Sequence, residues 1–129
     1  MRVVITGGTG LIGRALSHGF AADGHKAIVL SRSPGRAPAM PEGVRVVEWD
    51  ARTGDGWAEL ADGADAIVNL AGASLRRRWT PRSKKLIRDS RMHAGHAVVD
   101  AVRRVDRKPR LVVQASGTGA YGPRGDQVV

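Results

Sequence analysis

The chain has 129 residues, enough for one domain and too few for a second lobe. Lys and Arg number 21 against 12 Asp and Glu, and the formal charge of +9 favours anionic partners without choosing among them. Hydrophobic residues make up 42% of the chain, which excludes wholesale disorder, and the absence of Cys excludes disulfide scaffolds, thiolate metal sites and cysteine nucleophiles.

Five short runs rich in aliphatic residues predict β-strands. They are residues 2–6, 26–31, 44–49, 65–70 and 110–115. Four of them lack clean alternation of polar and apolar residues, which is typical of parallel strands covered on both faces. The run 44–49 contains Arg45 and Glu48 and therefore predicts an edge strand.

Helical periodicity separates several of these runs. The first helix is predicted from Leu11, Ile12, Ala15, Leu16, Gly19 and Phe20, with Gly24 at its C-cap. A long helix is predicted after Thr80, which can cap it, with Pro81 in the first turn. Its apolar face is predicted to comprise Leu86, Ile87, Ala94, Ala97, Val98, Ala101, Val102 and Val105. Residues 33–43 predict a loop, and residues 54–63 a short helix around Trp57 and Leu60.

Strands that alternate with helices predict an α/β fold of the doubly wound type. We expect a parallel sheet of about five strands with right-handed crossovers, forming one domain over residues 1–129. In such folds ligands bind beyond the carboxyl ends of the strands.

A glycine-rich motif, Thr6-Gly7-Gly8-Thr9-Gly10-Leu11-Ile12-Gly13, follows the first strand directly and opens the first helix. Strand before and helix after are the context of a dinucleotide-binding fingerprint. Gly7 and Gly8 allow a tight turn, Gly10 allows the backbone to approach a pyrophosphate, and Gly13 allows the helix to pack closely on the strand. Free N–H groups and the helix dipole then attract phosphate. The alternative is a glycine-rich turn without a ligand.

The end of the second strand bears on the choice of dinucleotide. NAD-specific folds place an acid there, but the stretch reads Ser31-Arg32-Ser33. The Arg32 guanidinium offers a planar set of donors suited to an adenosine 2′-phosphate, with Ser31 and Ser33 as lesser donors. We therefore predict NADP as the cofactor rather than NAD. The alternative is a solvated Arg in a loop.

Two further segments are candidates for cofactor contacts. The fourth strand ends Asn69-Leu70-Ala71-Gly72-Ala73, where small residues allow a sugar or nicotinamide ribose to lie against the backbone, although a plain turn explains them equally well. Asp50 follows the third strand and can accept a hydrogen bond from an adenine amino group. It can equally be a loop cap.

The chain resembles the extended short-chain dehydrogenase/reductases, the NAD(P)-dependent epimerase/dehydratase group, and within them the atypical epimerase family proteins. The resemblance rests on residues 6–13, 31–35, 69–72, 77–80, 87–91 and 116–122. It implies an NADP-binding Rossmann fold in which Gly7, Gly10, Leu11, Ile12, Arg32, Leu70, Ala71 and Gly72 line the cofactor. It also implies that Ser116 is the serine that hydrogen-bonds substrate in catalytic relatives.

The sequence departs from this family's pattern in its last residues. Typical members carry a Tyr and a Lys spaced Tyr-x-x-x-Lys on the next helix for proton transfer, and this chain stops at Val129 without them. Tyr121 has no Lys four residues later. We therefore expect the amino-terminal part of a longer ancestral protein that lacks the substrate region. The run 111–115 then exposes an apolar face, through which the chain can self-associate.

Other possible functions have weaker support in the sequence. The basic run at 76–78 and the Lys and Arg residues after it suggest nucleic acid, but the chain has only five aromatic residues to stack on bases, and a solvated helix face is the better interpretation. The four His residues lack a zinc motif, so we predict no metal. No apolar run is long enough to span a membrane, and we expect a cytoplasmic protein.

Two functions remain open: an NADP(H)-binding domain of an oxidoreductase acting on an unknown sugar-like or carbonyl substrate, and a non-catalytic dinucleotide-binding or sensor module.

Overall fold

The computed structural model describes residues 1–117, and its strands form one parallel sheet in the order β3-β2-β1-β4-β5. The strands are β1 (Arg2–Thr6), β2 (Lys26–Ser31), β3 (Val44–Glu48), β4 (Ala66–Asn69) and β5 (Leu111–Gln114). Every predicted strand is confirmed to within one residue at each end. The α/β class and the parallel sheet are confirmed with them.

The strand order creates a switch point between β1 and β4. From β1 the chain builds β2 and β3 on one side, then crosses to build β4 and β5 on the other. Connections on the two sides of β1 therefore diverge at the carboxyl ends of β1 and β4. In open α/β sheets this divergence opens the crevice in which ligands bind.

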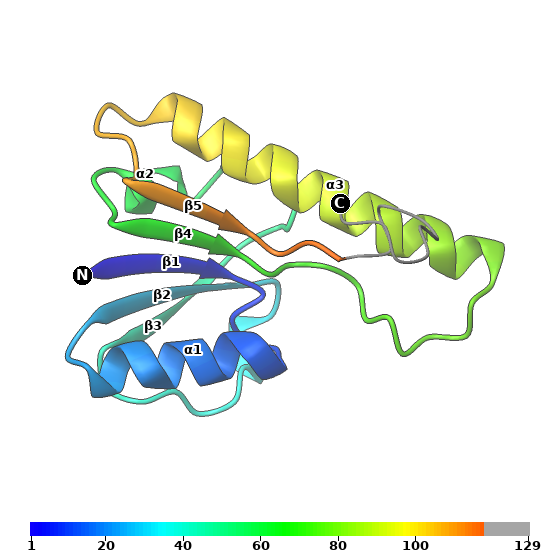
Figure 1. The fold of residues 1–129 in the computed structure, drawn as a ribbon, viewed down its shortest axis with the longest axis horizontal. Coiled ribbons are helices and arrows are strands. Elements are labelled where there is room, and N and C mark those ends of the chain that lie inside the picture. The colour runs from blue at the N-terminus through cyan, green and yellow to red at the C-terminus, as the bar shows by residue number, and fades with distance from the viewer. Residues whose placement is uncertain (118–129) are drawn as a thin grey trace, which may run out of the picture.

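Helices cover both faces of the sheet. Successive side chains of a strand point to opposite faces, so each strand can contribute residues to two separate cores. Val4, Ile28 and Ile67 belong to the larger core, which also contains residues of α2 (Ala58–Ala61) and α3 (Pro81–Arg104). Val3 and Val68 belong to the smaller core on the other face, where Leu16 and Phe20 of α1 (Leu11–Ala22) pack. Figure 1 shows α1 on one side of the sheet and α3 on the other.

The first helix has the predicted position but not the whole of the predicted apolar face. Its buried residues are Gly13 and Ser17, which are both small. Leu11 and Ile12 are 82% and 63% exposed, because they stand in the first turn, beyond the strand ends. The C-cap is Asp23, so the predicted cap, Gly24, lies one residue beyond the observed one, with a φ of +72°.

The long helix α3 is capped as predicted but is buried over a shorter length. The Thr80 hydroxyl accepts a hydrogen bond from the Ser83 N–H at 3.1 Å. Burial is confirmed for Ala94, Ala97, Val98, Ala101 and Val105. The prediction was wrong for Leu86, which is exposed. The first turns of α3 extend beyond the strands in Figure 1, so no sheet lies under them.

The remaining loops are close to their predictions. Residues 33–43 form a loop that includes one 3-10 turn, η1 (Pro34–Arg36), and the predicted short helix around Trp57 is α2. Within residues 1–117 no helix combines the length and apolar character that a membrane crossing requires.

The two edge strands of the sheet are β3 and β5. The polar strand β3 is an edge, as predicted. At the other edge Leu111, Val112 and Val113 are 55%, 44% and 42% exposed. The uncovered apolar face is therefore confirmed for the described part of the chain, and self-association through it stays a prediction.

Candidate functional site

The loop after β1 and the first turn of α1 leave no room for a side chain at Gly7 and Gly13. Gly7 has a φ of +67°, and a Cβ there would lie 2.8 Å from the carbonyl carbon of Leu70. At Gly13 a Cβ would lie 2.4 Å from the Gly8 Cα. Gly13 therefore packs against the loop itself, where close packing on the strand was predicted. These contacts fold the loop tightly beneath the start of α1.

The start of α1 presents backbone donors without a side-chain cap. Gly10 is the N-cap residue, its own N–H donates to the Gly7 carbonyl at 3.0 Å, and its carbonyl accepts from Arg14 at 2.9 Å. The first turn contains no acidic residue. The N–H groups of residues 11–13 have no acceptor within the helix, and they stand at the positive end of its dipole. Such a terminus is suited to an anion such as phosphate.

A buried polar network supports the loop from below. The Thr6 hydroxyl donates to Asn69 Oδ1 at 2.5 Å, and both side chains are fully buried. Asn69 Nδ2 donates to Gln114 Oε1 at 2.6 Å, and the Ala71 N–H donates to the Thr6 hydroxyl at 3.2 Å. The network links the carboxyl ends of β1, β4 and β5. Thr6 thus supports the site from within, and its hydroxyl faces other protein groups.

A groove lies at the carboxyl ends of β2 and β3. Its volume is about 650 Å³, and its lining includes Arg32, Glu48, Trp49, Asp50 and Asp55. Arg32 and Asp50, predicted from separate strands to contact the adenosine half of a cofactor, are therefore brought together. The Ser31 hydroxyl accepts from the Ser33 N–H at 3.2 Å and stays partly exposed beside Arg32.

Asp50 caps the loop that forms one wall of this groove. Its carboxylate accepts from the N–H groups of Arg52 (2.7 Å) and Thr53 (2.9 Å) and from the Thr53 hydroxyl (2.8 Å). Burial raises the pKa of Asp50, but these hydrogen bonds outweigh it, so the pKa lies below its ordinary value. The loop-cap alternative is therefore realised. An adenine contact through the same carboxylate is not tested and stays a prediction.

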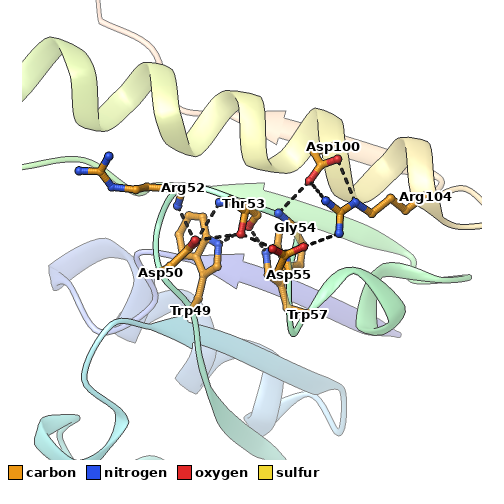
Figure 2. Close-up of polar contacts among 9 residues, drawn as sticks. All are labelled: Trp49, Asp50, Arg52, Thr53, Gly54, Asp55, Trp57, Asp100 and Arg104. Atoms are coloured by element: carbon orange, nitrogen blue, oxygen red, sulfur yellow. Dashed lines mark hydrogen bonds and ion pairs between the residues drawn. The ribbon is translucent and has the colours of Figure 1, made fainter.

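Two tryptophans fix this wall from behind, as Figure 2 shows. The indole N–H groups of Trp49 and Trp57 both donate to the Thr53 carbonyl, at 2.7 and 2.9 Å. Their rings meet edge to face with centroids 6.0 Å apart, and both side chains are buried. The sequence prediction missed this pairing, whose only signal is a Trp on each side of an Asp-x-x-Thr turn.

An ion-pair cluster on α3 holds the end of the same loop. The Asp100 carboxylate accepts from the Gly54 N–H at 3.0 Å and pairs with Arg104, which also reaches Asp55 at 2.5 Å (Figure 2). The Gly54 N–H and the Arg104 guanidinium hold the pKa of Asp100 below its ordinary value. The groove wall is therefore attached to the helix on the far side of the loop.

The turn after β4 lies against α3. The Ala73 N–H donates to the Ser90 hydroxyl at 2.9 Å, and Arg91 donates to the Ala73 carbonyl at 3.3 Å. A Cβ at Gly72 would lie 2.9 Å from Arg91 Cζ, so glycine there lets the guanidinium lie across the turn. Leu70 and Ala71 are partly buried beside the network of Thr6. Sequence reasoning did not single out Ser90 or Arg91 for this contact.

Ser116 lies two residues beyond β5 and is exposed. Its strand ends beside β4, where the Ala115 N–H donates to the Asn69 carbonyl at 3.0 Å. It therefore lies beside the carboxyl ends of β4 and β5, and its contact with substrate stays a prediction. Tyr121 and the rest of the 118–129 segment lie outside the described residues. No group of three or more metal-ligating side chains occurs in the described 117 residues.

Comparison with known proteins relates nearly the whole chain to one family. Epimerase family protein SH2119 of Staphylococcus haemolyticus is 35% identical over 120 residues, which cover 93% of this chain and 38% of that protein. The chloroplastic SDR39U1 homolog of Arabidopsis thaliana, also an epimerase family protein, is 36% identical over 95% of this chain and 36% of its own length. The chain thus spans less than two fifths of these relatives.

Solved structures agree with the sequence relatives. The crystal structure of human epimerase family protein SDR39U1 (isoform 2) with NADPH is 31% identical, with a TM-score of 0.68 over 96% of this chain and 39% of that one. A UDP-galactose 4-epimerase structure has a TM-score of 0.73 at 23% identity and supports the Rossmann-like fold alone. The model of the NAD dependent epimerase/dehydratase family matches residues 3–128. The chain belongs to this family.

Proposed function

We propose that this chain binds a nicotinamide dinucleotide, with NADP(H) preferred over NAD(H). The observation that carries the proposal is the uncapped amino terminus of α1, which follows a tight glycine loop at the switch point of the sheet. The human relative whose structure was solved with NADPH supports it.

The residues at the site are consistent with each part of such a ligand. The pyrophosphate would meet the backbone at Gly10, Leu11, Ile12 and Gly13. The adenosine half would occupy the groove of Arg32 and Asp50, with Ser31 beside it, and the nicotinamide half would lie near Leu70, Ala71 and Gly72. Thr6 serves this arrangement by fixing the floor through its hydrogen bonds to β4.

The preference for NADP rests on the balance of charge in the groove. Arg32 is exposed and can donate to a 2′-phosphate. Asp50 is satisfied by its own loop, and Asp55 is paired with Arg104. Glu48 is the groove carboxylate that would oppose a phosphate, and it is also the acid that could accept from the 2′-hydroxyl of NAD.

The chemistry proposed for the longer relatives is hydride transfer to or from a sugar-like or small carbonyl substrate. When bound, the nicotinamide supplies or accepts the hydride. The Ser116 hydroxyl can donate to a substrate oxygen and so orient it at the carboxyl edge of the sheet. That contact is proposed from the position of Ser116 after β5.

A second candidate is a dinucleotide-binding module without turnover. The sequence has one tyrosine, Tyr121, and Gly125 stands where the family's Lys would follow it. These 129 residues therefore contain no Tyr-x-x-x-Lys pair for proton transfer. Assays of NADPH oxidation by a longer relative, with a panel of carbonyl compounds and nucleotide sugars, test the first candidate. NADPH binding by this chain without any turnover in the same assays supports the second.

Isothermal titration calorimetry tests the binding itself. The folded chain is expected to bind both dinucleotides with one site and NADPH more tightly. Gly10→Val should abolish binding of both, whereas Gly35→Ala, whose Cβ would enter open space, should not. Absence of binding for both dinucleotides, with the protein folded by circular dichroism, would contradict the proposal.

A further inference from the structure

The positive charge of the chain is concentrated in one segment. Residues 74–91 contain eight Lys and Arg and a single Asp, a formal +7 out of the +9 of the whole chain. The segment runs from the turn after β4 through the first three turns of α3. In Figure 1 it lies beyond the carboxyl ends of the strands, the edge at which ligands bind.

Arg91 is the member of this segment that the fold fixes in place. Its Nη1 donates to the carbonyls of Ile87 at 3.0 Å and Ala73 at 3.3 Å, and its guanidinium lies against Gly72. Among residues 1–117 no carboxylate pairs with it. The carbonyls orient the guanidinium but leave its charge and its remaining N–H donors available.

Two further cations continue from Arg91 along α3. Lys84 and Arg88 precede it by seven and three residues and therefore share its side of the helix. Asp89 is the one acid nearby, and it is shared between Lys85 and Arg88. The helix thus presents a row of exposed positive charge that leads outward from the turn after β4.

We propose that Arg91, extended by Arg88 and Lys84, binds an anionic group of the substrate, a carboxylate or a phosphate. The inference rests on the proposed function, because it assigns a substrate class to the same crevice. A planar guanidinium held by two carbonyls is suited to bidentate recognition of either group. The sugar-like or small carbonyl substrate of the proposed function is therefore one that carries a carboxylate or phosphate, and not a neutral compound.

The position of Arg91 favours a small anion over a nucleic acid. The guanidinium lies against Gly72 and Ala73, in the turn proposed to hold the nicotinamide half. Trp79 is the one aromatic residue in the basic segment, so successive bases have no row of rings to stack on. The cofactor's own pyrophosphate already has the backbone donors of α1.

The experiment is an NMR titration of the 15N-labelled chain, saturated with NADPH, with inorganic phosphate and separately with acetate at constant ionic strength. Saturable shifts are expected at the Arg91 Nε–Hε signal and at the Gly72 and Ala73 amides. Arg91→Ala should raise the dissociation constant for phosphate at least fivefold, as measured at the two amides. The dissociation constant of Arg91→Lys should lie between those of the native chain and Arg91→Ala, because lysine keeps the charge but lacks the planar set of N–H donors.

Two control variants separate charge from structure. Ser90→Ala removes the other side-chain contact to the turn after β4 and keeps all the charge. A loss of phosphate affinity equal to that of Arg91→Ala would show that the position of the turn, and not the guanidinium, determines binding, and would overturn the inference. Arg103→Ala removes an exposed cation from the last turn of the same helix, and its phosphate affinity should stay within twofold of that of the native chain. The inference would be overturned if Arg103→Ala lost as much phosphate affinity as Arg91→Ala, or if the Arg91 signal showed no saturable shift.

The same spectra distinguish this inference from the cofactor proposal. Missing NADPH shifts at the Leu11 and Ile12 amides would overturn dinucleotide binding and the substrate assignment with it. NADPH shifts there without a phosphate response at Arg91 would overturn the substrate assignment alone. Duplex DNA that binds at Arg91 where phosphate and acetate do not would also overturn it, in favour of a nucleic-acid surface.

Discussion

The Thr6 hydroxyl donates to Asn69 Oδ1 at 2.5 Å, between two fully buried side chains at the carboxyl ends of β1 and β4. Asn69 also donates to Gln114, so one amide joins three neighbouring strands. The bond lies at the switch point of the sheet, directly below the glycine loop. The stability of the strands and the shape of the candidate site therefore depend on the same polar group.

Asn69→Ala is expected to lower the free energy of unfolding by about 1–3 kcal/mol, because it leaves the buried Thr6 hydroxyl without its acceptor. Urea unfolding followed by circular dichroism measures the change. Gln114→Ala is the control, since Gln114 is exposed and its loss should cost less. Equal stabilities of the two variants would show that the buried network does not support the sheet.

Gly13→Ala is expected to destabilise the fold by about 1–3 kcal/mol, because its Cβ would overlap the backbone of Gly8. The melting temperature should fall by several degrees. Gly19→Ala, in the same helix with open space around its Cβ, should leave the melting temperature unchanged or raise it. A melting temperature of Gly13→Ala equal to that of the native chain would contradict the close packing of the loop.

Arg32→Ala is expected to weaken NADPH binding by about 1–3 kcal/mol while leaving NADH nearly unaffected, because only NADPH carries the 2′-phosphate. Calorimetry measures both affinities. Glu48→Gln tests the opposing charge in the same groove and should strengthen NADPH binding. Equal losses for both dinucleotides in Arg32→Ala would refute the assignment of the 2′-phosphate.

Acid is expected to weaken the loop that forms the groove wall. The Gly54 N–H and Arg104 lower the pKa of Asp100 in the folded state, so its contribution to stability is present above the ordinary Asp pKa of about 4. That contribution is lost as the pH falls below about 4 toward the lowered pKa. Asp100→Asn should therefore make stability less dependent on pH in this range.

Stability of the native chain, Asp100→Asn and Asp106→Asn is measured by urea unfolding from pH 5 to pH 2. Asp106→Asn makes the same change of charge on an exposed residue outside the Gly54 contact. An unchanged pH dependence in Asp100→Asn would show that the contact of Asp100 with Gly54 and Arg104 contributes nothing to stability.

Much of the fold could be predicted because local signals determine it. Aliphatic runs without alternation indicate strands buried on both faces, and the capping pair Thr80 and Pro81 indicates where α3 begins. The exposure of Leu86 could not be predicted, because periodicity shows which side of a helix is apolar but not where the sheet beneath it ends. The same limit explains the exposed Leu11 and Ile12.

The candidate site could be predicted where one short segment carries it, as in the glycine loop and at Arg32. It could not be predicted where distant segments meet. The Trp49 and Trp57 indoles converge on one carbonyl only after the loop folds, and Arg91 reaches Ala73 only because α3 returns across the sheet edge. The capping role of Asp50 also depends on the geometry of its loop, which the residue type alone does not determine.

The most direct test of the central claim is a crystal structure of this chain grown with NADPH. The account predicts pyrophosphate oxygens within about 2.7–3.2 Å of the backbone nitrogen of Leu11 or Ile12, with the 2′-phosphate at Arg32. A dinucleotide bound elsewhere, with solvent at the amino terminus of α1, would contradict it.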